Sequence, residues 1–167
     1  MTGELAPATG LGLVAAIEAH SVAAWPATVV ESTHDGWVLR ATPGLLRRGR
    51  SNHALTPARP PAGGEYNEAL ARVARFAKAN GIDCGVQVSP LEIHIPLLDE
   101  LSGRGWAIQR SVVVMTGETQ VVAAGSDPAF DLTVTDQATP EWIEAWAHCD
   151  RRPDVEEHLQ TVFPAMA

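Results

Sequence analysis

The residues best suited to hold a charged ligand stand in one short stretch of a chain of 167 residues. Three arginines, Arg47, Arg48 and Arg50, fall within four positions. A guanidinium carries a planar fork of N–H donors that matches a carboxylate or a phosphate, so this run can bind an acidic substrate or the phosphate side of a cofactor. The alternative is an exposed strand whose charges alternate outward and pair with acidic neighbours. The residues leave both interpretations open.

A second set of reactive side chains lies near the C-terminal end and consists of His148, Cys149, Asp150 and His158. A zinc site uses paired ligands at short, fixed spacing, whereas His148 and Cys149 are adjacent and His158 is ten positions further on. Neighbouring residues on a helix point about 100° apart, so His148 is badly placed to act as a base for the Cys149 thiol. We therefore predict neither a metal site nor a nucleophile–base pair.

No catalytic residue is assigned from the remaining candidates. Tyr66, the single tyrosine, falls on the apolar face of a predicted helix and is expected in the core. Glu92, Glu141 and Glu144 would need a raised pKa in a cleft to act as general bases. Glu141 instead fits a first-turn position, where an acid interacts favourably with the helix dipole.

The N-terminal part supplies the elements that must position the arginines. Turn residues at Asp35-Gly36 and Pro43-Gly44 frame a short apolar run. We predict a helix over residues 12–25 that Pro26 ends, a strand over 37–41, an antiparallel returning strand over 45–55, and a loop over 56–64. In this arrangement Ser51 and Asn52 can hydrogen-bond the end of a strand.

The clearest helix is predicted over residues 65–81. Its apolar positions recur at helical spacing (Tyr66, Leu70, Val73, Phe76, Ala77), and Gly81 stands where a helix commonly ends in a left-handed glycine. After it we expect a strand over 83–90, a short helix from residue 97 that ends near Gly103 or Gly105, and a long strand over 106–118. The order of these elements predicts an α+β fold with a mixed, largely antiparallel sheet and flanking helices.

Beyond Gly117 the chain changes character, and we divide it into a domain over residues 1–117, a linker over 118–138 and a helical segment over 139–167. The linker contains a possible strand over 132–137. Thr139 is a good N-cap, so a helix is expected to start there, and another over 152–163. Trp142 and Trp146, four residues apart, predict an interface stripe on the first of these helices.

Composition excludes several classes of protein. The chain has 12 Lys and Arg against 20 Asp and Glu, a net charge of -8, which disfavours nucleic acid as a partner. The sequence contains no run of eighteen apolar residues, so no membrane span is predicted. Its first residues contain no basic segment, so no secretory signal is predicted either. Cys84 and Cys149 lie far apart and in no metal-type spacing, so a reduced cytoplasmic protein is expected.

One stretch resembles a known family. The segment "DGWVLRATPGLLRRGRSNHALTP" is similar to a signature of a subgroup of the GCN5-related N-acetyltransferases, the GNAT superfamily. The matching residues are Gly36, Trp37, Leu39, Arg40, Gly44, Arg47, Arg48, Ser51 and Asn52. The later "QVSPLEIHIPLLDELSGRGWAIQRSVVVM" and "TPEWIEAWAHCD" resemble further pieces of the same proteins. The resemblance covers about residues 25–115, and it implies a GNAT-like sheet and a substrate role for Arg48, Ser51 and Asn52.

The resemblance also implies two GNAT-like halves, of which the second binds acetyl-CoA. Its pyrophosphate loop has the form Arg/Gln-x-x-Gly-x-Gly/Ala at a strand-to-helix junction, where backbone N–H groups hold the phosphates. Two segments share the glycines of this form but lack the Arg or Gln at its first position. "PATGLG" has Pro7 there, and "ELSGRG" has Glu100.

We therefore expect the N-terminal portion of an acetyltransferase, catalytically incomplete and without tight acetyl-CoA binding. Its expected partner is a C-terminal half or a second copy, possibly in a swapped homodimer. The alternative is a stand-alone, degenerate GNAT-fold module for binding or oligomerisation.

Overall fold

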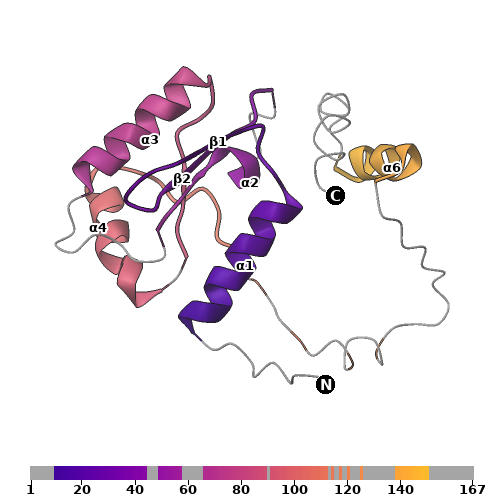
Figure 1. Cartoon of the computed structure of the whole chain (residues 1–167), viewed down its shortest axis with the longest axis horizontal. Coiled ribbons are helices and arrows are strands. Elements are labelled where there is room, and N and C mark those ends of the chain that lie inside the picture. Colours follow the sequence, from indigo (N-terminus) through magenta and orange to yellow (C-terminus); the bar gives the residue numbers. More distant parts are fainter. Residues whose placement is uncertain are drawn as a thin grey trace.

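The structure is a computed structural model that describes residues 10–44, 49–57, 66–89, 91–112, 114, 117, 120, 125 and 138–150. Within these residues the chain has an α+β fold (Figure 1). The elements run in the order α1 (Leu11–Ala24), β1 (Val29–Ser32), β2 (Val38–Ala41), α2 (Gly49–Asn52), β3 (Ala54–Leu55), α3 (Asn67–Ala79), β4 (Val86–Gln87), the 3-10 turn η1 (Glu92–His94), α4 (Ile95–Gly103) and α6 (Pro140–Asp150).

The strands form one sheet in the order β1-β2-β3-β4. The pairs β1/β2 and β2/β3 are antiparallel, whereas β3 and β4 are parallel. Parallel neighbours need a crossover connection, and α3 lies in the connection between β3 and β4. Figure 1 shows α3 and α4 on one side of the strands and α1 on the other. The sheet is thus mixed and mostly antiparallel, as predicted.

The turn between β1 and β2 confirms the prediction at Asp35-Gly36. Gly36 has φ 83°, a left-handed conformation that costs a glycine little. The Thr33 N–H donates to the Trp37 carbonyl across 2.9 Å, and the Thr33 hydroxyl oxygen accepts from the Trp37 N–H across 3.0 Å. These bonds close the turn and direct Trp37 toward the core.

The core lies between the sheet and the helices α3 and α4. Alternation along β2 turns Trp37, Leu39 and Ala41 to this side, and all three are buried. Tyr66 is also buried in this cluster, which confirms the prediction that it is a core residue. The other buried members of the cluster are Ala54, Ala69, Leu70, Val73, Leu97 and Leu101.

The predicted helices agree best with the structure. Helix α3 covers most of the predicted range over 65–81, and Gly81 has φ 63° just beyond its end. Helix α6 begins after Thr139, whose hydroxyl oxygen accepts from the Trp142 N–H across 3.3 Å. This bond is the predicted N-cap.

Two predicted strands were too long, and a third was wrong for its described residues. Of the described residues in the predicted returning strand over 45–55, only Ala54–Leu55 form a strand. Residues 49–52 form the helical turn α2 instead. The strand over 83–90 is reduced to β4. The strand over 106–118 was wrong for its described residues, since residues 106–112 pair with no strand there. A strand pattern needs a partner for its backbone groups, and the described part of the chain supplies none at this place.

Several predictions fall outside the described residues. They concern Arg47 and Arg48, the possible strand over 132–137 and the helix over 152–163. Among the residues that are described, no helix combines the length and the apolar character needed to cross a membrane.

Candidate functional site

The predicted substrate residues are placed as follows. Arg48 lies outside the described residues, whereas Ser51 and Asn52 are both buried in α2. The Asn52 side-chain oxygen accepts from the Thr42 N–H across 2.6 Å, directly after β2. Asn52 therefore has the strand-end role, and the substrate role of Ser51 and Asn52 stays a prediction.

The structure instead gathers a set of charged and polar side chains on the α1 side of the sheet. We call Glu18, Arg40, His53, Ser89 and His94 the buried polar cluster; Arg40, Ser89 and His94 are buried, whereas Glu18 and His53 are partly buried. Arg40 belongs to it because alternation along β2 turns this side chain away from the core face. The other four residues come from α1, from the residue before β3, from the segment after β4 and from η1. Distant parts of the chain thus meet at one place.

Arg40 is deeply buried in this cluster, with 2% of its surface exposed. Its Nε donates to the His53 carbonyl across 3.1 Å, while Nη2 is buried and has no hydrogen-bond partner within the described part of the chain. Burial lowers the pKa of Arg40 to about 10, against an opposing effect of Glu18. The guanidinium therefore stays cationic at neutral pH, and the nearby charge of Glu18 contributes to this.

Glu18 is the acidic side chain whose charge acts on Arg40. Its carboxylate accepts from the Ser89 hydroxyl and so joins α1 to the segment after β4. Burial raises the pKa of Glu18, and the positive charges of His94 and Arg40 oppose that rise. Desolvation thus has the larger effect on this carboxyl group, and the electrostatic attraction of its neighbours the smaller one.

His94 joins the two parallel strands where their pairing ends. The last paired residues are Leu55 and Gln87. Beyond them, His94 Nδ1 lies 3.0 Å from the Ser89 carbonyl oxygen and Nε2 lies 3.1 Å from the Pro57 carbonyl oxygen. Carbonyl oxygens only accept hydrogen bonds, so a ring nitrogen that carries a proton can donate to the carbonyl beside it. The ring thus bridges the segments that follow β3 and β4.

His53 fills a narrow space beside Arg40. A Cβ at Gly49 or at Gly85 would meet the His53 ring, so both glycines are needed to admit the imidazole. Burial lowers the pKa of His53, and Arg40 lowers it further, against the opposing charge of Asp83. The ring is therefore neutral at neutral pH and retains one basic nitrogen.

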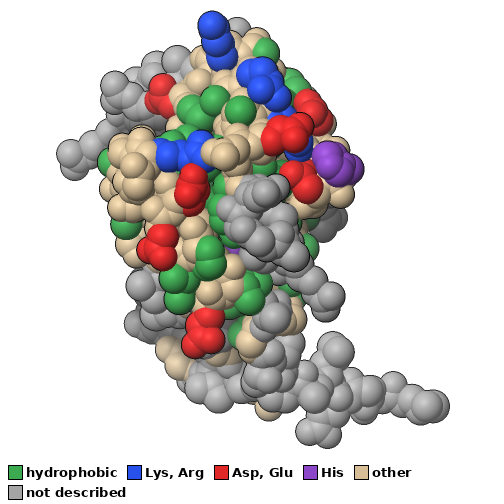
Figure 2. Space-filling view, turned by 90° about the vertical axis from the view of Figure 1, so that its left-hand side faces the viewer, with side chains coloured by type: hydrophobic (Ala, Val, Ile, Leu, Met, Phe, Trp, Pro, Cys, Tyr) green, Lys and Arg blue, Asp and Glu red, His purple; other side chains and the backbone are tan. Residues whose placement is uncertain are grey.

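A second feature lies on the opposite side of the sheet. We call it the α3 groove, a surface hollow of about 420 Å³ lined by Val29, Glu31, Leu39, Arg72, Arg75, Phe76, Ala79 and Asn80. Figure 2 shows the face of the molecule that carries α3, where basic side chains gather in the upper part beside acidic ones. Its lining combines apolar side chains with the charged residues Glu31, Arg72 and Arg75.

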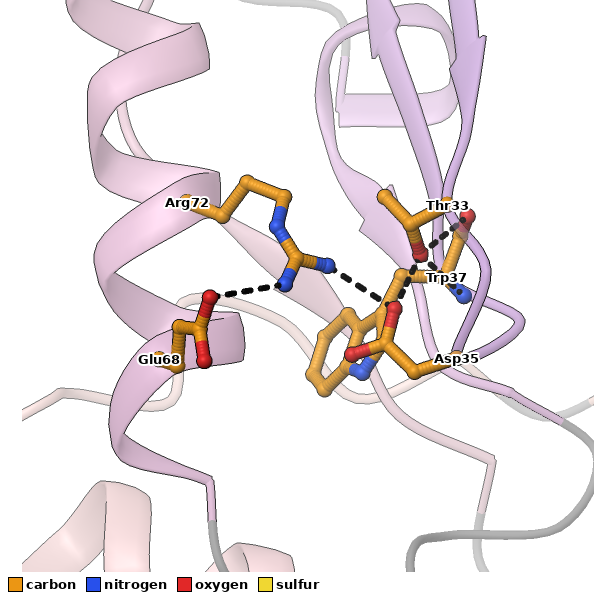
Figure 3. Close-up of polar contacts among 5 residues, drawn as sticks. All are labelled: Thr33, Asp35, Trp37, Glu68 and Arg72. Atoms are coloured by element: carbon orange, nitrogen blue, oxygen red, sulfur yellow. Dashed lines mark hydrogen bonds and ion pairs between the residues drawn. The ribbon is translucent and has the colours of Figure 1, made fainter.

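Arg72 on the rim of the α3 groove is held from two sides. Its Nη1 lies 2.8 Å from Asp35 Oδ1 and its Nη2 lies 3.6 Å from Glu68 Oε1 (Figure 3). Arg75, one turn further along α3, makes no ion pair with another described residue. Arg72 is therefore structural, whereas none of the described ion pairs engages Arg75.

The predicted interface tryptophans behave differently from one another. The Trp146 ring lies 6.0 Å from the Trp25 ring, measured between centroids, so α6 packs near the end of α1. Trp142 is 48% exposed. His148 and Cys149 are exposed, and no cluster of three metal-binding side chains exists among the described residues.

Sequence reasoning missed the buried polar cluster, although two signals pointed to it. Glu18 is a single acid in the apolar helix α1, and Arg40 is the single charge of β2. A lone charge on an otherwise apolar element is usually buried with a partner. An expected pair of Glu18 and Arg40 would have placed α1 beside β2. The sequence around His94 has no comparable feature that would place it in the cluster.

No protein-family model, no curated protein and no solved structure matches this chain. The likeness to the GNAT superfamily therefore rests on the sequence motifs quoted above.

Proposed function

We propose that this chain is the N-terminal portion of an acetyl-CoA-dependent N-acetyltransferase of the GNAT superfamily, and that it lacks a complete transfer centre. The observation that supports this best is the unit β3–α3–β4 within an otherwise antiparallel sheet. It lies in the region that also carries the signature motif. Arg40 and Asn52 of that motif are buried beside this unit.

The junction between β3 and α3 supports a weakened cofactor site. A pyrophosphate loop belongs at such a junction, and the sequence there reads Arg59-Pro60-Pro61-Ala62-Gly63-Gly64. It fits the form Arg-x-x-Gly-x-Gly except at Ala62. These residues lie outside the described part of the chain, so the comparison concerns sequence alone. Pro60 and Pro61 lack backbone N–H donors, and Ala62 takes the place of the first glycine of the motif.

His94 supports the same conclusion from another direction. Ligands of sheets with parallel strands often bind beyond the carboxyl ends of those strands. Here the His94 ring spans the ends of β3 and β4 and is 2% exposed. A cofactor entering between the two strand ends would have to displace this ring and break both of its hydrogen bonds.

In the proposed parent reaction, a base removes a proton from the acceptor amine, and the nitrogen attacks the thioester carbonyl. Backbone N–H groups stabilise the oxyanion, and the thiolate leaves and takes up a proton. We assign none of these steps to a described residue. We place the protein in the cytoplasm, because both cysteines are free and exposed.

A second candidate function is a stand-alone binding or oligomerisation module. It is favoured by the exposed apolar residues that follow α4, namely Ile108, Val112 and Val114. Large exposed apolar side chains close together commonly mark a surface that a partner covers.

Isothermal titration calorimetry with acetyl-CoA on this chain tests the proposal. We expect no binding up to millimolar ligand, and a micromolar Kd would contradict the assignment of an incomplete half. A Pro61→Ala/Ala62→Gly variant restores an N–H donor and a glycine at the junction. Weak binding by this variant, lost again on Arg59→Ala and kept on Arg104→Ala, would support descent from a cofactor-binding GNAT fold. No gain of binding would remove that support.

A further inference from the structure

Residues 106–112, directly after α4, have the pattern of a half-buried strand but no strand beside them in the described part of the chain. At the period of a strand, Trp106, Ile108, Arg110 and Val112 share one side of this segment, while Ala107, Gln109 and Ser111 share the other. Ile108 is 86% exposed and Val112 is 69% exposed. Such an apolar face is normally covered in a functional assembly.

The other end of the sheet offers the complementary feature. β1 is the first strand in the order β1-β2-β3-β4, so its outer edge has no neighbouring strand among the described residues. All four of its residues are exposed, and Val30 is 53% exposed. The backbone groups of an open edge can pair with an added strand. Beside this edge lies the α3 groove, with Val29 and Glu31 in its lining.

We propose that residues 106–112 of one copy of this chain add to the β1 edge of a second copy. A two-fold axis would make the addition reciprocal, so that both edges are covered and the assembly closes as a dimer. This proposal does not depend on acetyl transfer. It depends only on the open edge of β1 and on the exposed strand pattern after α4.

The charges specify one antiparallel register. Arg110 is the single charged residue of residues 106–112, and it lies on the same side as Ile108 and Val112. Glu31 is the single acid in the lining of the α3 groove. Placing Arg110 opposite Glu31 brings Val112 opposite Val29, so a charge pair and an apolar pair form together.

Two arginines also line the α3 groove with Glu31, namely Arg72 and Arg75. Arg72 is paired with Asp35 and Glu68, so Arg75 is the cation of the groove that competes with Arg110 for Glu31. The proposed contact is the pair of Glu31 with Arg110 of the second copy. In a chain of net charge -8, this pairing offsets part of the repulsion between two copies.

Sedimentation velocity on the full chain over a concentration series tests the dimer. We expect a monomer–dimer equilibrium that both Glu31→Arg and Arg110→Glu weaken at least about tenfold in Kd. The double variant Glu31→Arg/Arg110→Glu should return to within about threefold of the original Kd. Arg50→Glu, an exposed charge reversal on α2, is the matched control and should leave Kd unchanged.

An Ile108→Asn/Val112→Asn variant separates association from folding. Both side chains are exposed within the chain, so the thermal midpoint of a dilute sample should stay the same while the dimer is lost. A chain that stays monomeric up to millimolar concentration overturns the proposal. A dimer that survives these substitutions, or single charge reversals that the double variant does not rescue, overturns it as well.

Discussion

The guanidinium of Arg72 lies 2.8 Å from the carboxylate of Asp35, and this contact fixes helix α3 to the turn between β1 and β2. Asp35 also accepts from the Thr33 hydroxyl, whose oxygen accepts from the Trp37 N–H (Figure 3). Trp37 is buried in the core directly after the turn. One ion pair thus connects a helix, a turn and the most buried aromatic side chain of the sheet.

Asp35→Ala should reduce the free energy of unfolding by about 1–2 kcal/mol, because a partly buried carboxylate with two hydrogen-bond donors is lost. Glu68→Ala removes the other acidic partner of Arg72. The Glu68 side chain is 86% exposed, and its Oε1 lies 3.6 Å from Arg72 Nη2. Its loss should cost less than about 0.5 kcal/mol. Urea unfolding of both variants measures the difference, and equal losses would show that the turn does not depend on Asp35.

Burial of Glu18 predicts a specific pH dependence. Its pKa is raised above 4.5 by burial, with His94 and Arg40 opposing. The stability that protonated Glu18 contributes is therefore present below pH 4.5 and is lost as the pH rises through the pKa of the folded state. Glu18→Gln cannot ionise and still accepts from Ser89, so this variant should be the more stable protein at pH 7.

The gain for Glu18→Gln should be below about 1 kcal/mol, since the side chain is half-buried and partly screened by solvent. It should vanish near pH 4. Thermal unfolding at both pH values measures this gain in stability. Glu144→Gln, at an exposed position of α6, is the control and should leave the stability unchanged. A Gln variant less stable than the original chain at pH 7 would mean that attraction to Arg40 and His94 exceeds the burial cost.

How far the sequence predicts this structure depends on how local the deciding interactions are. Helix α3 was predictable because its apolar stripe and Gly81 are both local signals. β1 was missed because all four of its residues are exposed, which leaves no alternation between buried and exposed positions. Residues 49–52 were expected in a strand, but they form a helical turn in which Asn52 binds the backbone of Thr42.

The candidate site was less predictable than the helices for the same reason. The buried polar cluster joins side chains from α1, β2, η1 and two loops, so no spacing in the sequence relates them. Arg40 and Asn52 were named through the motif, yet their buried contacts follow from the register of β2 and β3. Register is set by tertiary packing and not by local propensity.

His94→Ala should destabilise the fold by about 2–4 kcal/mol, because it removes the ring contacts with two buried carbonyl oxygens and opens a space in the interior. The carbonyls of Pro57 and Ser89 are 3.1 Å and 3.0 Å from the ring nitrogens. Guanidinium unfolding measures the loss, and hydrogen exchange at Ala54 and Val86 should speed up because the ring no longer joins β3 to β4. His20→Ala, at an exposed position of α1, is the control, and an equally small loss in both variants would contradict the bridging role.

Gly85→Ala should destabilise the fold through one neighbour, the imidazole of His53. The added methyl group would overlap this ring, and Gly49 borders the ring closely as well, so the ring has little room to move. Overpacking of this kind costs about 1–3 kcal/mol. In a His53→Ala background the ring is gone, and the cost of Gly85→Ala should fall by more than half. Urea unfolding of the original chain, the two single variants and the double variant measures this difference as a coupling energy.

Gly103→Ala at the end of α4 is the control. Its added Cβ meets no atom within 4 Å, so this variant should be neutral or slightly stabilising. Additive losses for Gly85→Ala and His53→Ala would show that the glycine is required by the backbone and not by the ring.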